Sequence, residues 1–306
     1  MKAIFSLDIG GTNVRAGFVN KNSAGISGDE SYTLTGFTVN GSKALFREEP
    51  MKNLIEFIGG QIKSNAPETE TIAVSIGFPA SIDKRRKTVL SAPNLKGFDN
   101  VPVVDELEKA LGIPVVLGRD VSLLMSYDCY SLDIDTSGII IGCYFGTGLG
   151  NLIMIGGEIL YGKNGVAGEL GHIPERFNTQ PCGCGLTGCA ESFCAGIYLQ
   201  TITERNFPGT PIGDVFKDHA GHPVLLEYID GMAIPVAAEV TILDPDYVLL
   251  GGGILSMEGF PFDEFEAAIK RHTRKPYPAE NLRMVYSRPA QENGVIGAGI
   301  YAYRQI

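Results

Sequence analysis

The chain contains no tryptophan, only four histidines and only six cysteines among its 306 residues. Six cysteines are too few for a disulfide scaffold in a chain of this length, and free thiols suit a reducing cytoplasm best. Basic residues are also scarce, with 25 lysines and arginines against 35 aspartates and glutamates. Because the net charge of −10 leaves no basic face to neutralise phosphates, we expect no nucleic-acid partner.

Long apolar runs are absent as well. A transmembrane helix needs about 20 consecutive apolar residues, and the chain has no such span, so we expect no membrane partner. The first residues, MKAIFSLDIGGT, indicate a strand and a glycine turn, without the apolar segment or cleavage site of a signal peptide. With 39 glycines and 44% hydrophobic residues, the composition is typical of a soluble globular protein of one or two domains.

Hydrophobic periodicity predicts alternating strands and helices. In the first part we expect strands at 3–8, 14–19, 30–38, 71–76 and 115–117 and helices at 49–65 and 103–111, an α/β unit whose first three strands form a meander. In the second part we expect strands at 138–144, 152–155, 159–161 and 247–250 and helices at 121–130, 225–243, 262–272 and 294–303. The predicted domains are 1–118 and 119–290, with a helix at about 291–306 that packs back on the first.

One segment, GELGHIPERFNTQPCGCGLTGCAES (168–192), is the most informative in the chain. Its His172, Cys182, Cys184 and Cys189 are the ligand set of a closed Cys3His zinc site. Interspersed glycines allow the tight bends that closely spaced thiolates need to converge on one ion. The alternative is three cysteines buried as small hydrophobic residues, with an unrelated surface histidine. We favour the metal site because a glycine-rich CxCxxxxC pattern makes a poor core strand.

Two glycine turns, each between two expected strands, suggest phosphate sites. The first is Gly10-Gly11-Thr12, directly after the buried strand that ends near Asp8, and the second is Gly146-Thr147-Gly148. Glycine lets the backbone approach an anion closely, and an adjacent aspartate is placed to hold Mg2+ through water. Either turn alone is weak evidence, because ordinary tight β-turns use the same glycines about as often.

Two further positions have both a functional and a structural interpretation. Gly251-Gly252-Gly253 follows a strand and leaves a flat space for a nucleotide, but it is equally consistent with a tight turn. Asp120 stands where a strand meets a helix, so it could accept the proton of an attacking hydroxyl. It could also cap the helix, which spacing alone slightly favours.

These segments together resemble a known family. DIGGTNVRAG (8–17), GFP (77–79), RDV (119–121), GTGLG (146–150), GELGH (168–172), CGCGLTGCAE (182–191) and LLGGGI (249–254) occur in the order found in ROK proteins. That family contains sugar kinases and sugar-sensing repressors. The resemblance implies an α/β, actin-like and hexokinase-like (ribonuclease H-like) fold with a cleft between two lobes. Within the family the chain looks most like the D-allose kinases, through GFPA, APNL, RDV and VAGELGHIPE.

The resemblance also implies roles for individual residues. Asp120 would be the catalytic base, and ATP with Mg2+ would be held by Asp8, Gly10, Gly11, Thr12, Gly146, Thr147, Gly148 and Gly252. The sugar hydroxyls would be bound by Asn94, Arg119, Asp120, Glu169, His172 and Glu191, and structural Zn2+ by His172, Cys182, Cys184 and Cys189. A homodimer is the family-level expectation.

Arg119 departs from the family pattern, which usually has asparagine there to help hold sugar hydroxyls. Arginine only donates hydrogen bonds and is always charged, so it argues against glucose and fits an epimer such as allose. Glucose, fructose, mannose and N-acetylmannosamine remain alternatives. A repressor is disfavoured because Met1 stands only seven residues before Asp8, with no room for a helix-turn-helix. A sugar-binding protein without catalysis is disfavoured because Asp120 and both glycine turns are present.

Overall fold

The computed structural model describes residues 1–23 and 30–306, which form two compact units. Unit 1 comprises Met1–Ile134, Tyr161–Val166 and Ala290–Ile306, and unit 2 comprises Asp135–Leu160 and Ala167–Pro289. Within the described ranges, no helix has both the length and the apolar character that crossing a membrane requires.

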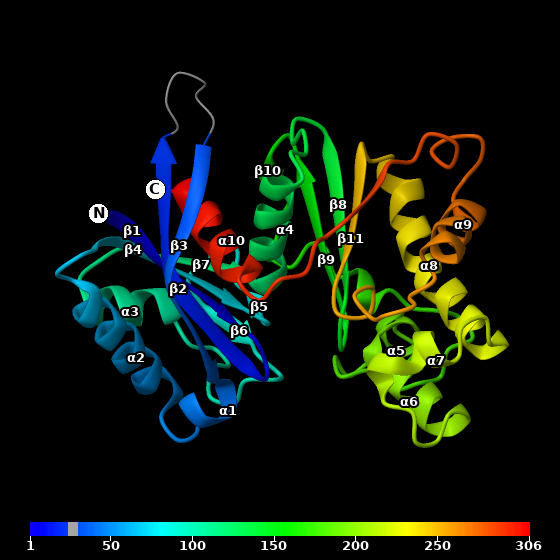
Figure 1. Ribbon diagram of the computed structural model, residues 1–306, viewed down its shortest axis with the longest axis horizontal. Helices are drawn as coiled ribbons and strands as arrows, with labels where there is room; N and C mark the ends of the chain where they lie inside the picture. Colours follow the sequence, from blue (N-terminus) through cyan, green and yellow to red (C-terminus); the bar gives the residue numbers. More distant parts are fainter. Residues whose placement is uncertain (24–29) are drawn as a thin grey trace. The chain divides into compact units, whose positions relative to one another are not determined.

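A five-stranded mixed sheet forms the centre of unit 1, with the strand order β3-β2-β1-β4-β7 (Figure 1). Its strands are β1 (Lys2–Ile9), β2 (Asn13–Ser23), β3 (Glu30–Gly41), β4 (Glu70–Phe78) and β7 (Val115–Arg119). Antiparallel pairing of β1 with β2 and of β2 with β3 confirms the expected meander, whereas β4 pairs parallel with both β1 and β7. A separate two-stranded sheet is formed by β5 (Ser81–Ile82) and β6 (Val89–Ser91).

Helices pack on both faces of this sheet because its strands are apolar on both sides. On one face α2 (Pro50–Asn65) and α3 (Val103–Leu111) share a core with the buried Phe5 and Leu7 of β1. Side chains alternate along a strand, so Asp8 points to the other face. There α4 (Asp120–Ser131) and α10 (Asn293–Tyr303) pack on each other and on the sheet. A short helix, α1 (Ser42–Leu45), follows β3.

Unit 2 has its own five-stranded mixed sheet, of order β10-β9-β8-β11-β12. The first four of these strands are labelled in Figure 1. The strands are β8 (Ile139–Phe145), β9 (Leu149–Ile155), β10 (Glu158–Ile159), β11 (Tyr247–Gly251) and β12 (Met284–Tyr286). The paired helices α8 (Pro223–Leu243) and α9 (Phe262–His272) share a core with one face of this sheet. Shorter helices complete the unit: α5 (Glu191–Cys194), α6 (Gly196–Asn206), α7 (Val215–Asp218) and the 3-10 turns Leu170–His172 and Ile212–Asp214.

The two sheets have the same topology. In each, the first strand in sequence lies in the centre, with two antiparallel neighbours on one side and two parallel strands on the other. The recurrence of a strand, a glycine turn and a second strand in the sequence therefore corresponds to a repeated three-dimensional unit.

The boundary between the units differs from the expected one near Gly118. Unit 1 extends to Ile134 because α4 packs on α10 and on β4 and β7. The segment Tyr161–Val166 also belongs to unit 1, since the hydroxyls of Tyr161 and Tyr301 are hydrogen-bonded at 2.7 Å. Neither contact leaves a local signal in the sequence.

Candidate active site and metal centre

Two acidic side chains, Asp8 and Asp120, lie near each other in unit 1. Asp8 is at the end of β1, and its Oδ2 is 3.5 Å from Nη1 of Arg15 on β2. Burial raises the pKa of Asp8, and the positive charge of Arg15 opposes this rise. Burial also raises the pKa of Asp120 to about 6, with Arg119 lowering it and the negative charge of Asp8 raising it. A carboxyl with this pKa can exchange a proton near neutral pH.

Asp120 is also the first residue of α4, one position earlier than the sequence pattern predicts. Its Oδ1 accepts a hydrogen bond from the backbone N–H of Val121 at 2.8 Å. The helix-terminal interpretation and the catalytic interpretation are therefore compatible, because the helix start holds one carboxylate oxygen in place. A position at a helix N-terminus also favours the ionised form.

Ser42 holds the first glycine turn from outside. Its hydroxyl donates to the carbonyl of Gly10 at 2.6 Å, and its N–H donates to the carbonyl of Thr12 at 2.9 Å. A side chain at Gly11 would lie 3.5 Å from Cβ of Asn94, so the fold brings Asn94 beside this turn. Sequence reasoning missed both Ser42 and Arg15. Arg15 lies within a predicted strand and Ser42 shortly after another, and polar residues at such places are too common to single out.

The second glycine turn is held from two sides in unit 2. The N–H groups of Gly196 and Ile197, at the start of α6, donate to the carbonyls of Gly146 and Thr147 at 2.8 and 3.2 Å. Gly252 has a φ of +100° and packs so closely on the backbone of Phe145 that no side chain fits there. The fold thus brings the Gly251–Gly253 segment against Phe145, which directly precedes the second turn.

Glu191 connects this turn to the cysteine cluster. Its Oε2 accepts a hydrogen bond from the backbone N–H of Leu149 at 3.0 Å, and its Oε1 is 4.0 Å from Sγ of Cys182. A side chain at Gly148 would collide with the Glu191 carboxylate. The glycine turn and the metal-ligand segment are therefore one structural assembly.

The four expected metal ligands converge. One donor atom from each of His172, Cys182, Cys184 and Cys189 lies within 4.8 Å of all the others. The Nδ1 of His172 is 3.5 Å from Sγ of Cys182, and the sulfurs of Cys184 and Cys189 are 3.6 Å apart. One imidazole and three thiols in such a cluster match the donor set that zinc prefers.

The histidine ring also connects the cluster to a carboxylate. While Nδ1 of His172 faces the thiols, its Nε2 lies 3.7 Å from Oε2 of Glu169. A metal-bound histidine commonly has its second nitrogen beside a carboxylate, which fixes the ring orientation. Glu169, His172 and Glu191 are therefore grouped around the cluster, as the sequence predicted.

The loop that presents the cysteines is held by backbone geometry and by Asn178. Gly185 and Gly188 have φ values of +91° and +84°, which other residues rarely adopt. The Asn178 side chain donates to the carbonyl of Cys189 at 3.0 Å and to the hydroxyl of Ser192 at 2.8 Å. Sequence reasoning found these glycines but missed Asn178.

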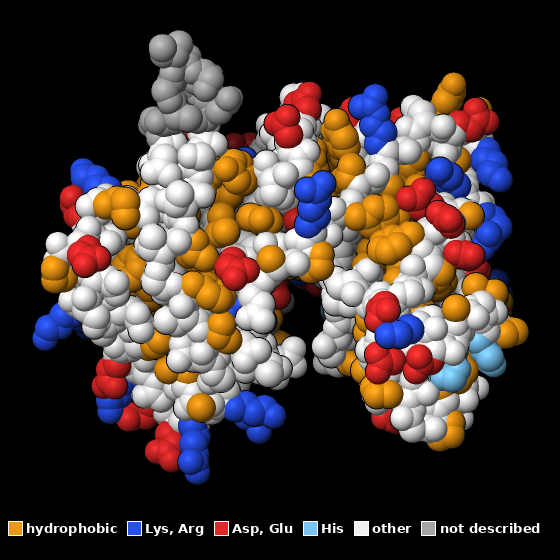
Figure 2. Space-filling model, in the orientation of Figure 1, with side chains coloured by type: hydrophobic (Ala, Val, Ile, Leu, Met, Phe, Trp, Pro, Cys, Tyr) orange, Lys and Arg blue, Asp and Glu red, His pale blue; other side chains and the backbone are white. Residues whose placement is uncertain are grey.

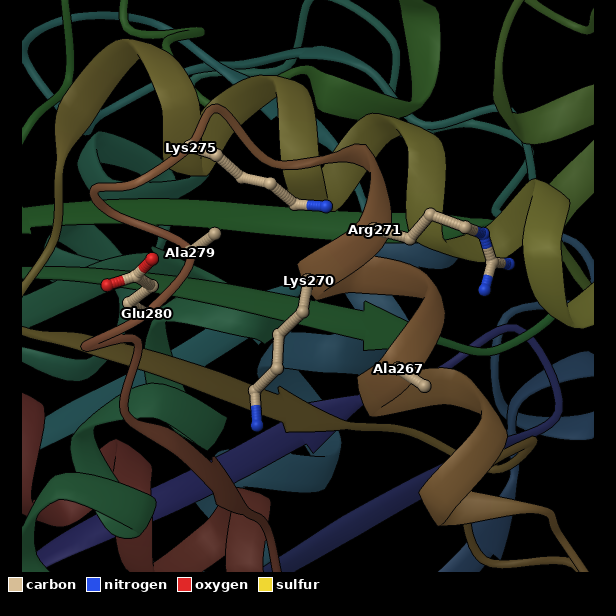
Figure 3. Close-up of a pocket in the computed structure, with 6 residues that line it drawn as sticks. All are labelled: Ala267, Lys270, Arg271, Lys275, Ala279 and Glu280. Carbon is tan, nitrogen blue, oxygen red and sulfur yellow. The ribbon is translucent and has the colours of Figure 1, made fainter.

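A cavity of about 480 Å³ lies elsewhere, between the second half of α9 and the segment that follows it (Figure 3). Lys270, Lys275 and Glu280 line it, and Arg271 at its edge pairs with Asp230. None of the predicted site residues lines this cavity. Figure 2 shows side chains of both charges interspersed over this part of unit 2, which is typical of a solvated surface.

The predicted site residues are distributed over both units. Unit 1 holds the catalytic candidate and the first turn, namely Asp8, Gly10, Gly11, Thr12, Asn94, Arg119 and Asp120. Unit 2 holds the second turn and the metal segment, namely Gly146, Thr147, Gly148, Glu169, His172, Glu191 and Gly252 with the three cysteines.

Comparisons with known proteins find relatives over almost the whole chain. The chain is 27% identical to a glucokinase of Halalkalibacterium halodurans, over 96% of this chain and 92% of that protein. It is 24% identical to an N-acetyl-D-glucosamine kinase of Vibrio cholerae, over 96% and 97%. Its fold matches the crystal structure of a ROK family glucokinase from Streptomyces griseus in complex with glucose and AMPPNP, with a TM-score of 0.78, 23% identity and 99% of both chains covered.

These matches confirm the expected actin-like, hexokinase-like fold with its mixed sheets. The family comparison covers almost the whole chain, because residues 4–305 match the ROK family. The two glycine turns, the grouped carboxylates and the Cys3His cluster are the structural counterparts of the motifs that suggested it. The chain therefore belongs to the ROK family.

Proposed function

We propose that this protein is an ATP-dependent hexose kinase that phosphorylates the primary hydroxyl of its sugar. The observation that carries the proposal is the partly buried Asp120 carboxyl, which lies near Asp8 and Arg119 and whose pKa is raised to about 6. Ionised at neutral pH yet able to take a proton, it suits a general base. The names of the relatives, glucokinases and an N-acetyl-D-glucosamine kinase, support the same reaction class.

In the proposed reaction the primary hydroxyl oxygen of the sugar attacks the γ-phosphorus of ATP. The new O–P bond forms as the bond from the γ-phosphorus to the bridging oxygen breaks, and ADP leaves with that electron pair. Asp120 accepts the hydroxyl proton late, since phosphoryl transfer has a loose transition state. Most of the catalysis then comes from positioning and charge stabilisation.

We assign the nucleotide to the glycine segments of both units. Gly10, Gly11 and Thr12 with Gly146, Thr147 and Gly148 would hold the phosphates, and Gly252 would lie by the adenosine. Asp8 would hold the magnesium of MgATP through water, and its partner Arg15 limits the burial-induced rise of its pKa. The hydrogen bonds from Ser42 and from the start of α6 support this assignment because they make both turns rigid.

We assign the sugar hydroxyls to Asn94, Arg119, Asp120, Glu169, His172 and Glu191. His172, Cys182, Cys184 and Cys189 would hold Zn2+, which would supply a rigid structural crosslink and no chemistry of its own. The Nε2 of His172 faces Glu169 and is 3.7 Å from its carboxylate, so the ring supports that side chain.

For the sugar itself we propose D-allose, converted to D-allose 6-phosphate. The support is Arg119, which lies directly before the base and acts electrostatically on it. A donor-only, always charged side chain there disfavours a sugar that needs an acceptor at that place. Glucose, fructose and N-acetylmannosamine are the alternatives, and the Vibrio cholerae relative adds N-acetyl-D-glucosamine.

A coupled assay of ADP release with a panel of hexoses tests the proposal. The panel contains D-allose, glucose, fructose, mannose, N-acetylmannosamine and N-acetyl-D-glucosamine, compared by kcat/KM. Highest kcat/KM with D-allose supports the full proposal, and highest kcat/KM with another sugar replaces the substrate but keeps the kinase. If no sugar stimulates ADP release, a sugar-binding or regulatory protein becomes the better interpretation.

A further inference from the structure

One buried acidic residue, Glu239 in the middle of unit 2, has no part in the mechanism above. It lies on α8, is 6% exposed, and its Oε2 accepts a hydrogen bond from Nδ2 of Asn151 at 2.8 Å. The thiol of Cys143 also donates to Oε2, at 3.7 Å. Burying a carboxyl in a core is costly unless its partners are well placed. A hydrophobic residue would fill this place at lower cost, so the carboxyl needs another explanation.

Asn151 carries the connection away from Glu239. It lies on β9, is 1% exposed, and its Nδ2 also donates to the carbonyl of Gly142 at 3.1 Å. Among the described residues, its buried Oδ1 has no hydrogen-bond partner. The orientation of the Asn151 amide is therefore fixed through its nitrogen. Among the described residues, the Glu239 carboxylate is the only side chain whose oxygen accepts a hydrogen bond from this nitrogen.

Gly168 packs directly on Asn151. A Cβ at Gly168 would lie 3.0 Å from the carbonyl oxygen of Asn151 and 3.2 Å from its Oδ1, and the glycine has a φ of +81°. The next residue is Glu169, which directly precedes the 3-10 turn Leu170–His172. The chain therefore enters the Leu170–His172 turn in close contact with the backbone carbonyl and the amide oxygen of Asn151.

The same strand also holds Glu191. Leu149, two residues before Asn151, donates its N–H to the Glu191 carboxylate at 3.0 Å. A side chain at Gly171 would lie 3.0 Å from the carbonyl of Leu149, so the turn packs on this part of β9. Glu239, Asn151, Gly168 and Glu169 also line one cavity of about 290 Å³.

We propose that Glu239 is a positioning residue for the sugar, acting through Asn151 and Gly168 on Glu169. This inference rests on the proposed function, because it takes Glu169 to be a sugar ligand. Glu239 itself touches no substrate. Its hydrogen bond holds the Asn151 side chain in place, and the Gly168 backbone packs on Asn151. The Glu169 carboxylate, on the next residue, is thereby oriented toward the sugar.

Three variants separate this role from a purely structural one. Glu239→Leu removes the acceptor at similar volume, Glu239→Gln keeps an acceptor oxygen without the charge, and Asn151→Ala removes the link. Losing a hydrogen bond of this kind should raise KM for the sugar about tenfold in Glu239→Leu and Asn151→Ala. KM for ATP should stay unchanged, and Glu239→Gln should remain within about twofold of wild type.

The double variant Glu239→Leu/Asn151→Ala tests the connection itself. Because both changes break one chain of contacts, the double variant should have the sugar KM of either single variant. Multiplying effects would overturn the proposal. If Glu239→Leu does not fold, Glu239→Gln and Asn151→Ala still decide, since a rise in sugar KM in Glu239→Gln equal to that in Asn151→Ala contradicts the acceptor role.

The outcomes are distinguishable from a failure of the proposed function. If the wild-type protein phosphorylates a sugar and Glu239→Leu keeps its sugar KM, the positioning role is wrong and the kinase stands. A lower proportion of active protein with an unchanged sugar KM indicates a purely structural role. If the wild-type protein neither binds nor phosphorylates any sugar of the panel, the proposed function has failed first.

Discussion

The carboxylate of Glu191 accepts a hydrogen bond from the backbone N–H of Leu149 at 3.0 Å, directly after the second glycine turn. This contact makes the metal-ligand loop and the proposed phosphate turn mechanically dependent on each other, because Gly148 leaves no space between them. A disturbance of the cysteine cluster should therefore reach the nucleotide as well as the sugar.

Removing the proposed base should abolish most turnover. Asp120→Asn keeps the size of the side chain but cannot accept the hydroxyl proton, so kcat should fall about 10²- to 10⁴-fold. Steady-state kinetics check this, with circular dichroism confirming the fold. Wild-type activity in this variant would remove Asp120 as the base.

The same variant should be more stable than wild type at alkaline pH. The folded-state pKa of Asp120, about 6, lies above its ordinary value of 3.8, so the ionised carboxylate destabilises the folded protein. The protonated Asp120 carboxyl therefore adds to the stability of the folded protein at pH below 3.8, and this contribution is lost as pH rises through about 6. Thermal melts at pH 8 and pH 4 should show a higher Tm for Asp120→Asn only at pH 8, and equal differences at both values would contradict this.

The pH profile of the wild-type enzyme should report the same carboxyl. As pH falls below about 6, kcat/KM should decrease because Asp120 becomes protonated. Arg119→Gln should move the midpoint to higher pH, because the arginine lowers the pKa of Asp120. A profile that is level from pH 5 to pH 8, or a midpoint that moves down in Arg119→Gln, speaks against this assignment.

The cluster should bind zinc tightly and in a structural role. Cys184→Ala should lose the metal, and the loss should lower Tm and raise KM for both substrates. Metal analysis of freshly purified protein checks the first part. Cys129→Ala is the control, since Cys129 lies on α4 in unit 1 and should leave the zinc content at wild-type level.

Gly148 should not tolerate even a methyl group. Gly148→Ala places Cβ against the Glu191 carboxylate, which must move, and this should raise KM for ATP about tenfold or more. Gly183→Ala serves as the control, because its Cβ would meet nothing within 4 Å. If both variants have wild-type kinetics, the contact between Glu191 and the glycine turn does not affect ATP binding.

Long periodic elements could be predicted from the sequence. The helix over Val103–Leu111 was found at its observed bounds, because an amphipathic pattern ends there at Gly112. The helices α5 and α7 were missed because a four-residue helix has no period to detect. The 11-residue helix α6 was missed as well, and its buried residues are only Leu199, Ile202 and Thr203. Likewise β12 is only three residues long, and its three side chains are all only partly buried.

The site was predictable where its chemistry depends on residue type and spacing. The four metal ligands lie within one short segment, so their convergence followed from local sequence. No pattern of residue type and spacing identifies Ser42, Arg15 or Asn178. Their contacts, with Gly10, Asp8 and Ser192, appear only in the folded structure. Asp120 was ambiguous because a helix start and a general base can use the same residue. In the structure Arg119 is the N-cap of α4, and Asp120 is its first residue, whose carboxylate accepts from the N–H of Val121.

Unit 1 has a consequence for how the protein is made. Its chain is interrupted by unit 2, and its last element, α10, packs on β1, β2, β4 and α4. During synthesis the central sheet of unit 1 therefore emerges from the ribosome long before the helix that covers one of its faces. Unit 2, encoded in between, has all of its strands available earlier, so it should complete its fold first, while Asp8 acquires its neighbour Gly294 only at the end of translation.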